Sequence, residues 1–206
     1  MTAMATIFPP GEIVETADHR VQMHEISWEH YEQLLEMRGE RPQPRMSYLD
    51  GELELMTTSE DHERITNWIA RLAETYLAEL GIEFSSYGHY TQKEKLARAG
   101  LEPDQCYRIG LDQTRGRSPD LAIEVNWTRG GIHKLEIYRR LGVREVWFWQ
   151  DDEISVHTLI KNRYVVADAS AVVPGVDLEL LASFIDEPLM SKAVRDYRAA
   201  LATRRT

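Results

Sequence analysis

The sequence contains a single cysteine, Cys106, among its 206 residues. An internal disulfide is therefore excluded, and so is a zinc ion held by several cysteines. No stretch approaches the roughly 18 uninterrupted apolar residues that a membrane span requires. The N-terminal segment MTAMATIFPPGEIVE also lacks the basic segment and long apolar segment of a secretion signal. We therefore expect a cytoplasmic protein.

Positive charge is scarce as well, with 24 Lys and Arg against 34 Asp and Glu and a formal net charge of -10. Affinity for a phosphate backbone comes chiefly from surface Lys and Arg, so this balance argues against non-specific coating of nucleic acid. It does not exclude a nuclease, because a metal site needs clustered carboxylates and only a local basic rim. With 43% hydrophobic residues, the chain fits one α/β domain over residues 1–206.

The two ends of the chain differ from its middle. Residues 1–20, which include Pro9-Pro10-Gly11, predict an irregular arm, whereas residues 188–203 predict an amphipathic C-terminal helix. Such an arm and helix make a symmetric homodimer a reasonable expectation. Further along, Ser27 is expected to cap a helix that Gly39 ends.

Residues 45–56 predict a β-hairpin. Asp50-Gly51 is typical of a two-residue turn, and apolar residues alternate on either side of it, at Met46, Tyr48, Leu53 and Leu55. Glu52 and Glu54 fall on the opposite face of this hairpin. We expect that face to be solvated, because isolated carboxylates are rarely buried.

A long helix is predicted from Ser59 to Leu80, because apolar residues recur there at helical spacing. His62 lies within the apolar stripe and is expected to point inward, whereas Glu63 is rotated by about 100° away from it. An inward histidine is more often a hydrogen-bonded core residue than a catalyst. Both interpretations of His62 stay open at this point.

Residues 120–126 form the most strand-like segment in the chain. Alternation places Asp120 and Glu124 on one face, separated by about 13 Å at about 3.3 Å per residue. One Mg²⁺ ion, with ligands at about 2.1 Å, cannot be held by both. The predicted strand containing Asp104 precedes this one, and the connection between them is long enough to reverse direction. We therefore expect Asp104 and Glu124 to form the metal pair, with Asp120 at the strand's entrance.

Lys134 has an unusual place in the helix predicted for residues 132–142. At about 100° per residue, Lys134 falls in the middle of an apolar arc that comprises Ile132, Leu135, Ile137, Tyr138 and Leu141. An inward lysine needs a carboxylate or an aqueous cleft, because an unpaired buried charge is costly. Its place in the first turn is also close to the C-terminal end of the preceding strand, where Glu124 lies.

Two interpretations of this pair stay open. A Lys134–Glu124 ion pair can be purely structural, since ion pairs outnumber active sites. Asp104 on an adjacent strand favours metal-assisted phosphodiester hydrolysis instead. The acids would fix the metal, which polarises the phosphate and lowers the pKa of a bound water. The ammonium would stabilise developing charge or orient the nucleophile.

The segments EPDQCYRIG and SPDLAIEVNWTRGGIHKLEIYRRLGVREVWFWQ resemble the Uma-type restriction-endonuclease family of the PD-(D/E)XK nuclease superfamily. The likeness runs from the hairpin DGELELM through DHERI and covers roughly residues 45–185. It implies an α/β, restriction-endonuclease-like fold, in which helices flank a central mixed β-sheet and additional β-hairpins are present. It also implies Mg²⁺ and a nuclease-type site. Our first hypothesis is therefore a metal-dependent endonuclease that acts on DNA with Mg²⁺ or Mn²⁺, although the sequence does not distinguish DNA from RNA.

The resemblance assigns site residues by position. Asp104 matches the aspartate of the first PD pair, and Glu124 matches the acid of the E-x-K element. The superfamily pattern places a lysine two residues after that acid, where this chain has Asn126. Members of this family carry the lysine on the next helix, at the position of Lys134. His62 matches a histidine typical of the family's first long helix and is a further site candidate.

Basic residues bracket the predicted Asp104 strand, namely Lys93, Lys95, Arg98, Arg115 and Arg117. They are expected either to form the local rim that DNA phosphates need or to be ordinary solvated surface. Two alternatives to the enzyme stay open. The absence of a lysine at Asn126 favours an inactive nucleic-acid-binding module, and the predicted arm and C-terminal helix suit a protein-interaction subunit.

Overall fold

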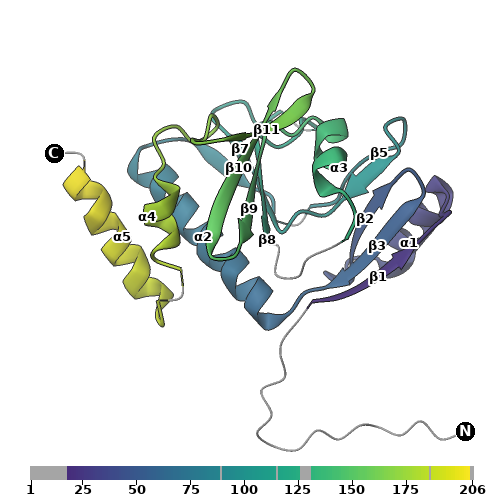
Figure 1. The fold of residues 1–206 in the computed structure, drawn as a ribbon, viewed down its shortest axis with the longest axis horizontal. Coiled ribbons are helices and arrows are strands. Elements are labelled where there is room, and N and C mark those ends of the chain that lie inside the picture. The colour runs from purple at the N-terminus through teal and green to yellow at the C-terminus, as the bar shows by residue number, and fades with distance from the viewer. Residues whose placement is uncertain (1–17, 89, 115, 126–130, 186, 205–206) are drawn as a thin grey trace, which may run out of the picture.

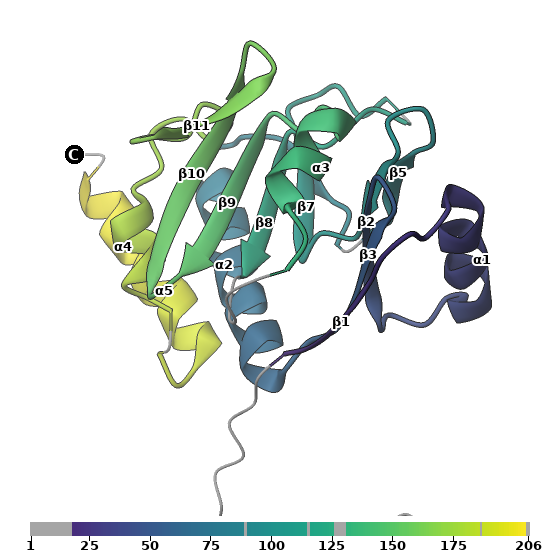
Figure 2. The same ribbon diagram turned by 45° about the vertical axis from the view of Figure 1, so that its right-hand side comes forward.

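The computed structural model describes residues 18–88, 90–114, 116–125, 131–185 and 187–204. Six strands form its central sheet in the order β11-β10-β9-β8-β7-β4 (Figures 1 and 2). Their bounds are β4 Phe84–Ser86, β7 Gln105–Ile109, β8 Leu121–Val125, β9 Glu145–Gln150, β10 Glu153–Ile160 and β11 Arg163–Ala167. β8 and β9 are parallel and the other neighbours are antiparallel, so the sheet is mixed, as the sequence predicts.

Helices cover both faces of this sheet. Figure 2 shows α3 (Lys134–Leu141) in front of it and α2 (Glu60–Glu79) behind it, with α5 (Met190–Arg204) on the same side as α2. α4 (Leu178–Ala182) also packs near α2. β8 lies between the two helical layers, and all five of its residues are buried. Its sequence, LAIEV, is therefore nearly continuous in apolar residues, with one acid among them.

The predicted alternation along β8 is present. Leu121, Ile123 and Val125 belong to the core cluster that contains α2, whereas Ala122 belongs to the cluster that contains α3. A parallel strand followed by a helix and a second parallel strand requires the helix to cross one face of the sheet. α3 makes this crossover between β8 and β9, which places its first residue near the end of β8.

A second, five-stranded sheet has the order β1-β3-β2-β6-β5. Its strands are β1 His19–Met23, β2 Arg45–Leu49, β3 Glu52–Thr57, β5 Gln92–Glu94 and β6 Ala99–Leu101. The helix α1 (Trp28–Arg38) packs on its outer face around Trp28, Tyr31 and Tyr48. The opposite face turns toward α3, and Ala99 and Leu101 join the α3 core cluster. β2 is consequently covered on both sides.

Several local predictions are confirmed. Ser27 accepts a hydrogen bond from the backbone of the first turn of α1, and Gly39 ends that helix. Ser59 caps α2 in the same way. Gly142 ends α3 with a left-handed conformation, at φ 73°. The two-residue turn at Asp50-Gly51 joins β2 to β3, with positive φ at both residues.

Two local predictions are wrong. Residues 19 and 20 of the predicted irregular arm belong to β1, which pairs with β3 along its whole length, while residues 1–17 lie outside the described part. Glu54 is not on a solvated face but is 2% exposed. Its face of the hairpin turns toward the segment that leads into α3, whereas Glu52, next to the turn, is exposed as expected.

The predicted C-terminal helix corresponds to α5. Its residues Ala193 and Tyr197 are buried in the core cluster that contains α2, so its apolar stripe packs within the chain. The expected homodimer loses this helix as its supporting argument, and it stays a prediction that light scattering would test. None of the helices in the described residues combines the length and apolar composition needed to cross a membrane.

Two fully buried acids hold the end of the sheet where β8 and β9 begin. Asp120 accepts hydrogen bonds from Arg117, Arg144 (3.1 Å) and the backbone N–H of Ile109 (2.9 Å). Glu145 has neutral donors instead, comprising Trp147 Nε1 (2.7 Å), Thr158 Oγ1 (3.3 Å), Ala171 N (2.8 Å) and Ser170 Oγ. Each acid ties a loop to the sheet.

Replacing Glu145 with alanine should lower the free energy of unfolding by about 2–4 kcal/mol, because it leaves several buried donors without a partner. Glu153→Ala, at an exposed position of β10, should change it by less than about 0.5 kcal/mol. Urea denaturation of both variants measures this difference. Equal stabilities would show that Glu145 does not anchor residues 170–171.

Candidate active site

The two acids predicted to hold a metal lie opposite each other. β7 and β8 are antiparallel, with Gln105 opposite Ile123 in the register. One further step along the ladder places Asp104 opposite Glu124, toward the arrowhead of β8 in Figure 2. The Asp104 carboxylate also accepts a hydrogen bond from the backbone N–H of Val125, with Oδ2 at 2.7 Å. Both acids are buried, at 2% and 0% exposure.

Glu124 is held by two side chains from α3. Lys134 Nζ lies 2.5 Å from Oε2, and the Tyr138 hydroxyl donates a hydrogen bond to Oε1. Lys134 and Tyr138 are one helical turn apart and therefore share a face. Burial, together with the negative charge of Glu124, raises the pKa of Tyr138 well above its ordinary value, so the phenol remains a donor. The predicted proximity of Lys134 and Glu124 is present.

Asp104 is held from the second sheet and from α2. Arg45, a buried residue of β2, donates to Asp104 Oδ1 and also to Glu63 Oε1 at 2.7 Å. His62 Nε2 lies 3.0 Å from Asp104 Oδ2. That nitrogen makes no properly directed hydrogen bond in the described part of the chain. A fully buried ring nitrogen is therefore aimed at the acid without being satisfied by it.

The other side of the His62 ring contacts Asp18, just before β1. His62 Nδ1 lies 2.9 Å from Asp18 Oδ2, while Asp18 Oδ1 accepts the Ser59 N–H at 2.9 Å. Burial tends to raise the pKa of Asp18, but hydrogen bonds from His62 and Ser59 outweigh it and leave the pKa below its ordinary value. The carboxylate form of Asp18 thus fixes the orientation of an imidazole that faces Asp104.

A third buried acid supports the segment before Lys134. Glu54 Oε2 accepts a hydrogen bond from the Ile132 N–H at 3.1 Å. Gly131 lies so close that an added Cβ would be 2.5 Å from Glu54 Oε2 and 3.0 Å from Arg20 Nη1. Its φ of 111° is also one that residues with side chains rarely adopt. Glu54 therefore fixes the approach to α3 two residues before Lys134.

The donor set fits a divalent cation in type. Two buried carboxylates, Asp104 and Glu124, come from paired strands, and carboxylate oxygen is the ligand that Mg²⁺ prefers. Among the described residues, no group of three or more His, Cys, Asp and Glu side chains is arranged to hold an ion. Mg²⁺ usually binds through one or two carboxylates plus water and substrate phosphate, so a larger protein cage is not required.

The predicted basic rim is largely compensated by carboxylates. Lys93 pairs with Glu32 at 2.9 Å and Lys95 with Glu29 at 3.1 Å. Arg98 lies 3.7 Å from Asp50, and Arg117 pairs with Asp120 and Asp112. Arg115 and Asn126 lie outside the described residues. Among the described residues, the surface around these rim cations therefore has little net positive charge.

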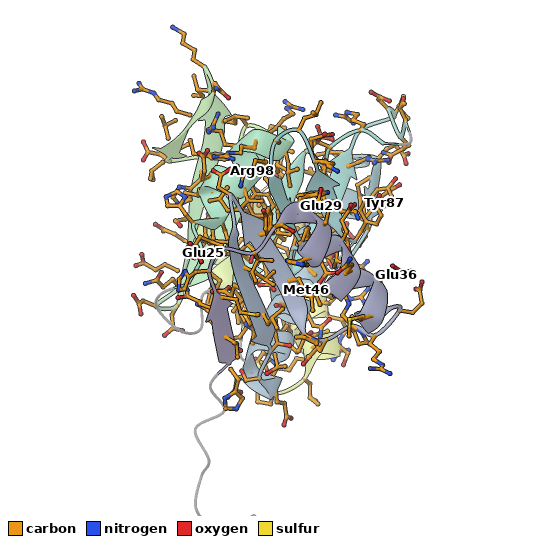
Figure 3. All side chains as sticks on the ribbon, turned by 90° about the vertical axis from the view of Figure 1, so that its right-hand side faces the viewer. Glu25, Glu29, Glu36, Met46, Tyr87 and Arg98 are labelled. Atoms are coloured by element: carbon orange, nitrogen blue, oxygen red, sulfur yellow. The ribbon has the colours of Figure 1, made fainter. Side chains whose placement is uncertain are left out.

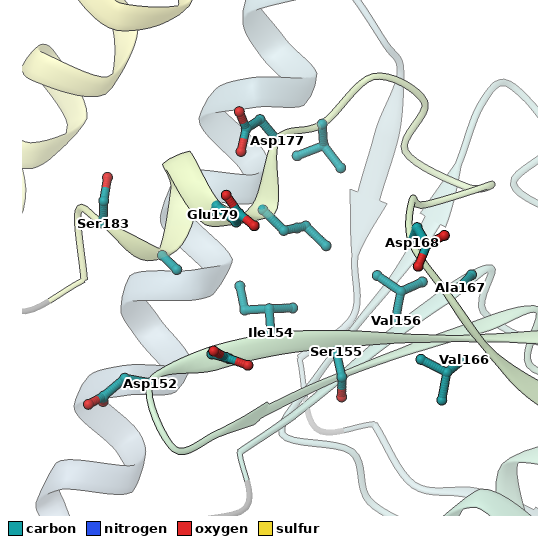
Figure 4. Close-up of a pocket in the computed structure, with 14 residues that line it drawn as sticks. Asp152, Ile154, Ser155, Val156, Val166, Ala167, Asp168, Asp177, Glu179 and Ser183 are labelled. Atoms are coloured by element: carbon teal, nitrogen blue, oxygen red, sulfur yellow. The ribbon is translucent and has the colours of Figure 1, made fainter.

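A groove of about 870 Å³ lies elsewhere, between β10, β11 and α4 (Figure 4). Its lining combines apolar side chains such as Ile154 and Val156 with five acids, which are Asp152, Glu153, Asp168, Asp177 and Glu179. None of the described residues that line it is basic. This groove repels phosphate and lies at the opposite edge of the sheet from β7, so it is separate from the Asp104–Glu124 site.

Four residues of the site are absent from the sequence-based prediction. Tyr138 had a signal, since it shares the apolar arc of Lys134, but tyrosine in such an arc usually indicates core packing. Arg45 and Asp18 act across distances in sequence that no local pattern reveals. The pattern around Glu54 indicated exposure instead of burial, because this residue alternates with apolar residues as a solvated residue would.

Comparison with known proteins assigns most of the chain to one family. A model of the Uma2 family, described as "Putative restriction endonuclease", matches residues 28–184. One solved structure of similar shape, from Anabaena variabilis ATCC 29413, is titled as "a putative nuclease belonging to DUF820". It is 15% identical, with a TM-score of 0.47 over 76% of this chain and 94% of that chain.

No curated protein matches the sequence. The family match spans most of the chain, including the β2–β3 hairpin, α2, the β7–β8 pair and α3. The chain therefore belongs to the Uma2 family.

Proposed function

We propose that this protein is a metal-dependent endonuclease that hydrolyses phosphodiester bonds in DNA. The observation that carries this proposal is the placement of Asp104 opposite Glu124 with the Lys134 ammonium 2.5 Å from Glu124. Membership of a family described as restriction endonucleases supports the same reaction class. Cleavage of a phosphodiester needs charge stabilisation at the phosphate and an activated water, and this site concentrates the groups suited to both.

Asp104 and Glu124 would hold the metal, with Mg²⁺ as the expected ion and Mn²⁺ as a substitute. When bound, such an ion polarises the phosphate and lowers the pKa of a coordinated water. The remaining ligands would be water and phosphate oxygens. The buried position of both carboxylates suits this role, because a divalent charge in a low-dielectric site interacts strongly with them.

The surrounding side chains divide the other tasks. Lys134 carries a positive charge at the acid pair and is placed to stabilise charge on the phosphate. Tyr138 orients Glu124, and Arg45 orients Asp104 from the other side. His62, held by Asp18, positions Asp104 and places a ring nitrogen at the site. Glu54 positions the segment that carries Lys134.

A second function, an inactive binding module with the same fold, also has an observation in its favour. Asp104 and Glu124 are each satisfied by cationic or polar side chains of the protein itself. Such a network can be stable without a metal, as buried ion pairs often are when fully hydrogen-bonded. The two functions differ in what happens when the acids are neutralised, because only the enzyme loses a reaction.

Asp104→Asn and Glu124→Gln should each reduce Mg²⁺- or Mn²⁺-dependent cleavage of DNA by at least about 100-fold, because each removes a charged metal ligand. Cleavage of a supercoiled plasmid, followed over time on a gel, measures the rate. Glu36→Gln is a matched control on the exposed surface of α1 (Figure 3) and should keep the full rate. Equal rates for all three variants and the unmodified protein would refute the metal site.

Lys134→Met should lower kcat by roughly 100-fold, whereas Lys134→Arg should retain more activity, because a positive charge remains. Thermal unfolding of the same proteins separates this role from a structural one. A Lys134→Met variant that is inactive yet binds Mn²⁺ and stays folded supports the catalytic role. Full activity in that variant would make the Lys134–Glu124 pair a structural ion pair.

A further inference from the structure

A pocket of about 470 Å³ lies toward the end of the β7–β8 pair where β8 begins, between β5, β7 and the last turn of α3, and none of the residues of the candidate site lines it. Among the described residues, four cationic side chains and one carboxylate, that of Glu94, line it; the cations are Lys93, Arg108, Arg117 and Arg140. It therefore differs in charge from the acidic groove of Figure 4. Nothing in the proposed reaction so far uses it.

Arg108 differs from the other three cations of this pocket. Lys93, Arg117 and Arg140 pair with Glu32, Asp120 and Asp50. Arg108 is 7% exposed and, among the described residues, makes no ion pair with a carboxylate at contact distance; the Asp112 carboxylate interacts with it only at longer range. Its guanidinium donates instead to the Tyr87 hydroxyl (3.1 Å) and to the Arg117 carbonyl (2.5 Å), and Nε has no hydrogen-bond partner. A buried cation without a counter-charge is costly, so the position favours an anion.

A second unsatisfied donor lines the same pocket. Gln92, on β5, is 8% exposed; its amide lies beside the Cys106 thiol, and its Nε2 makes no directed hydrogen bond within the described part of the chain. The neighbouring thiol of Cys106 donates to the Gly88 carbonyl. Burial raises the pKa of that thiol to about 12, so it adds no negative charge. Two strands thus each direct an N–H donor without an acceptor into one basic pocket.

Two tyrosines provide aromatic surface at this pocket. Tyr87 is 37% exposed and Tyr90 is 61% exposed. One face of the Tyr87 ring is covered by the Arg108 guanidinium, 4.5 Å from the ring centroid. Figure 3 shows Tyr87 toward the right-hand side of the molecule. Exposed aromatic rings beside a cationic pocket are what proteins use to stack nucleic-acid bases.

The pocket lies within reach of a strand bound at the acid pair. Asp104, Cys106 and Arg108 alternate along β7, so Asp104 and Arg108 are about 13 Å apart. Phosphates in a stacked strand repeat at about 3.4 Å, and an extended strand spans the same distance with fewer nucleotides. A phosphate at Arg108 would therefore be only a few nucleotides from one at Asp104.

We propose that this pocket binds the phosphate of a nucleotide, with Arg108 and Gln92 as its donors and Tyr90 beside the base. This inference rests on the proposed function, because it assigns the nucleotide to the same strand that reaches Asp104 and Glu124. One buried guanidinium, that of Arg108, and one amide donor, that of Gln92, suit a single phosphate rather than a long duplex backbone. They also allow a protein of net charge -10 to hold nucleic acid at a defined point.

The test is binding without cleavage. Fluorescence anisotropy with a labelled single-stranded DNA oligonucleotide, in EDTA and with the Glu124→Gln protein, removes the reaction from the measurement. Adding Arg108→Gln to this protein should raise Kd by roughly tenfold or more, because a charge-assisted contact to phosphate is lost. Arg163→Gln removes the same charge from an exposed position of β11 and should change Kd by less than about twofold.

A competition assay distinguishes a phosphate that belongs to a bound strand from one that belongs to a free nucleotide. Thymidine monophosphate and inorganic phosphate should displace the oligonucleotide from the Glu124→Gln protein that retains Arg108. If the mononucleotide binds in an Arg108-dependent way and the oligonucleotide does not, the strand assignment is overturned and the pocket belongs to a free nucleotide. If Arg108→Gln and Arg163→Gln behave alike with every probe, the phosphate pocket itself is overturned.

A second variant covers the case in which Arg108→Gln fails to fold. Gln92→Leu keeps the charge of the pocket and removes one donor, and it should raise Kd several-fold with an unchanged unfolding midpoint. An unchanged Kd in that variant would contradict the pocket. Because binding is measured without metal or turnover, a failure here is distinguishable from a failure of the acid pair, which only the cleavage assay reports.

Discussion

Two carboxylates that face each other across the β7–β8 ladder repel, and much of the structure around them offsets that repulsion. In an antiparallel pair, opposite Cα atoms are only about 4.5–5.5 Å apart. Like charges at such separation disfavour the ionised forms unless cations or hydrogen bonds compensate. Lys134 and Tyr138 donate hydrogen bonds to Glu124, whereas Arg45 and the Val125 N–H donate to Asp104. Elements from both sheets and from two helices converge for this reason.

The buried acids of this protein fall into two groups according to their position in the sheet. Asp120 and Glu145 lie where β8 and β9 begin, and their partners are loop residues that they anchor. Asp104 and Glu124 lie at the other end of the β7–β8 pair, where side chains from several distant segments meet. Burial of an acid alone therefore does not indicate a reaction site. The proposed reaction site rests instead on the convergence of two acids, a lysine and an oriented histidine.

Residues that lie close in sequence or follow one periodicity could be predicted. The alternation in β8 and the inward place of Lys134 led to the Glu124–Lys134 contact, because both follow from the geometry of a strand and of a helix. Glu54 could not be predicted in this way. It occupies a polar position of a hairpin, and its burial depends on a segment, residues 131–132, that packs on it from far along the chain.

The side chains that hold Asp104 were equally hard to predict from the sequence. Arg45 and His62 contact that acid from two segments, Asp18 holds His62 from a third, and only His62 had a local signal. The sequence of β2 alternates, with Arg45 at a polar position, yet residues on both of its faces are buried, so this arginine has the pattern of a solvated residue. Strand geometry and family resemblance both indicated Asp104 and Glu124, and the register of β7 with β8 places these two positions opposite each other.

A crystal soaked in Mn²⁺ tests the central claim most directly. The account predicts anomalous density between Asp104 and Glu124, with carboxylate oxygens from both residues within about 2.3 Å of the ion. Arg45 or Lys134 would shift away from its acid to admit the metal. Density confined to other surface acids, with both acids still bonded to Arg45 and Lys134, would contradict a metal-dependent site at this pair.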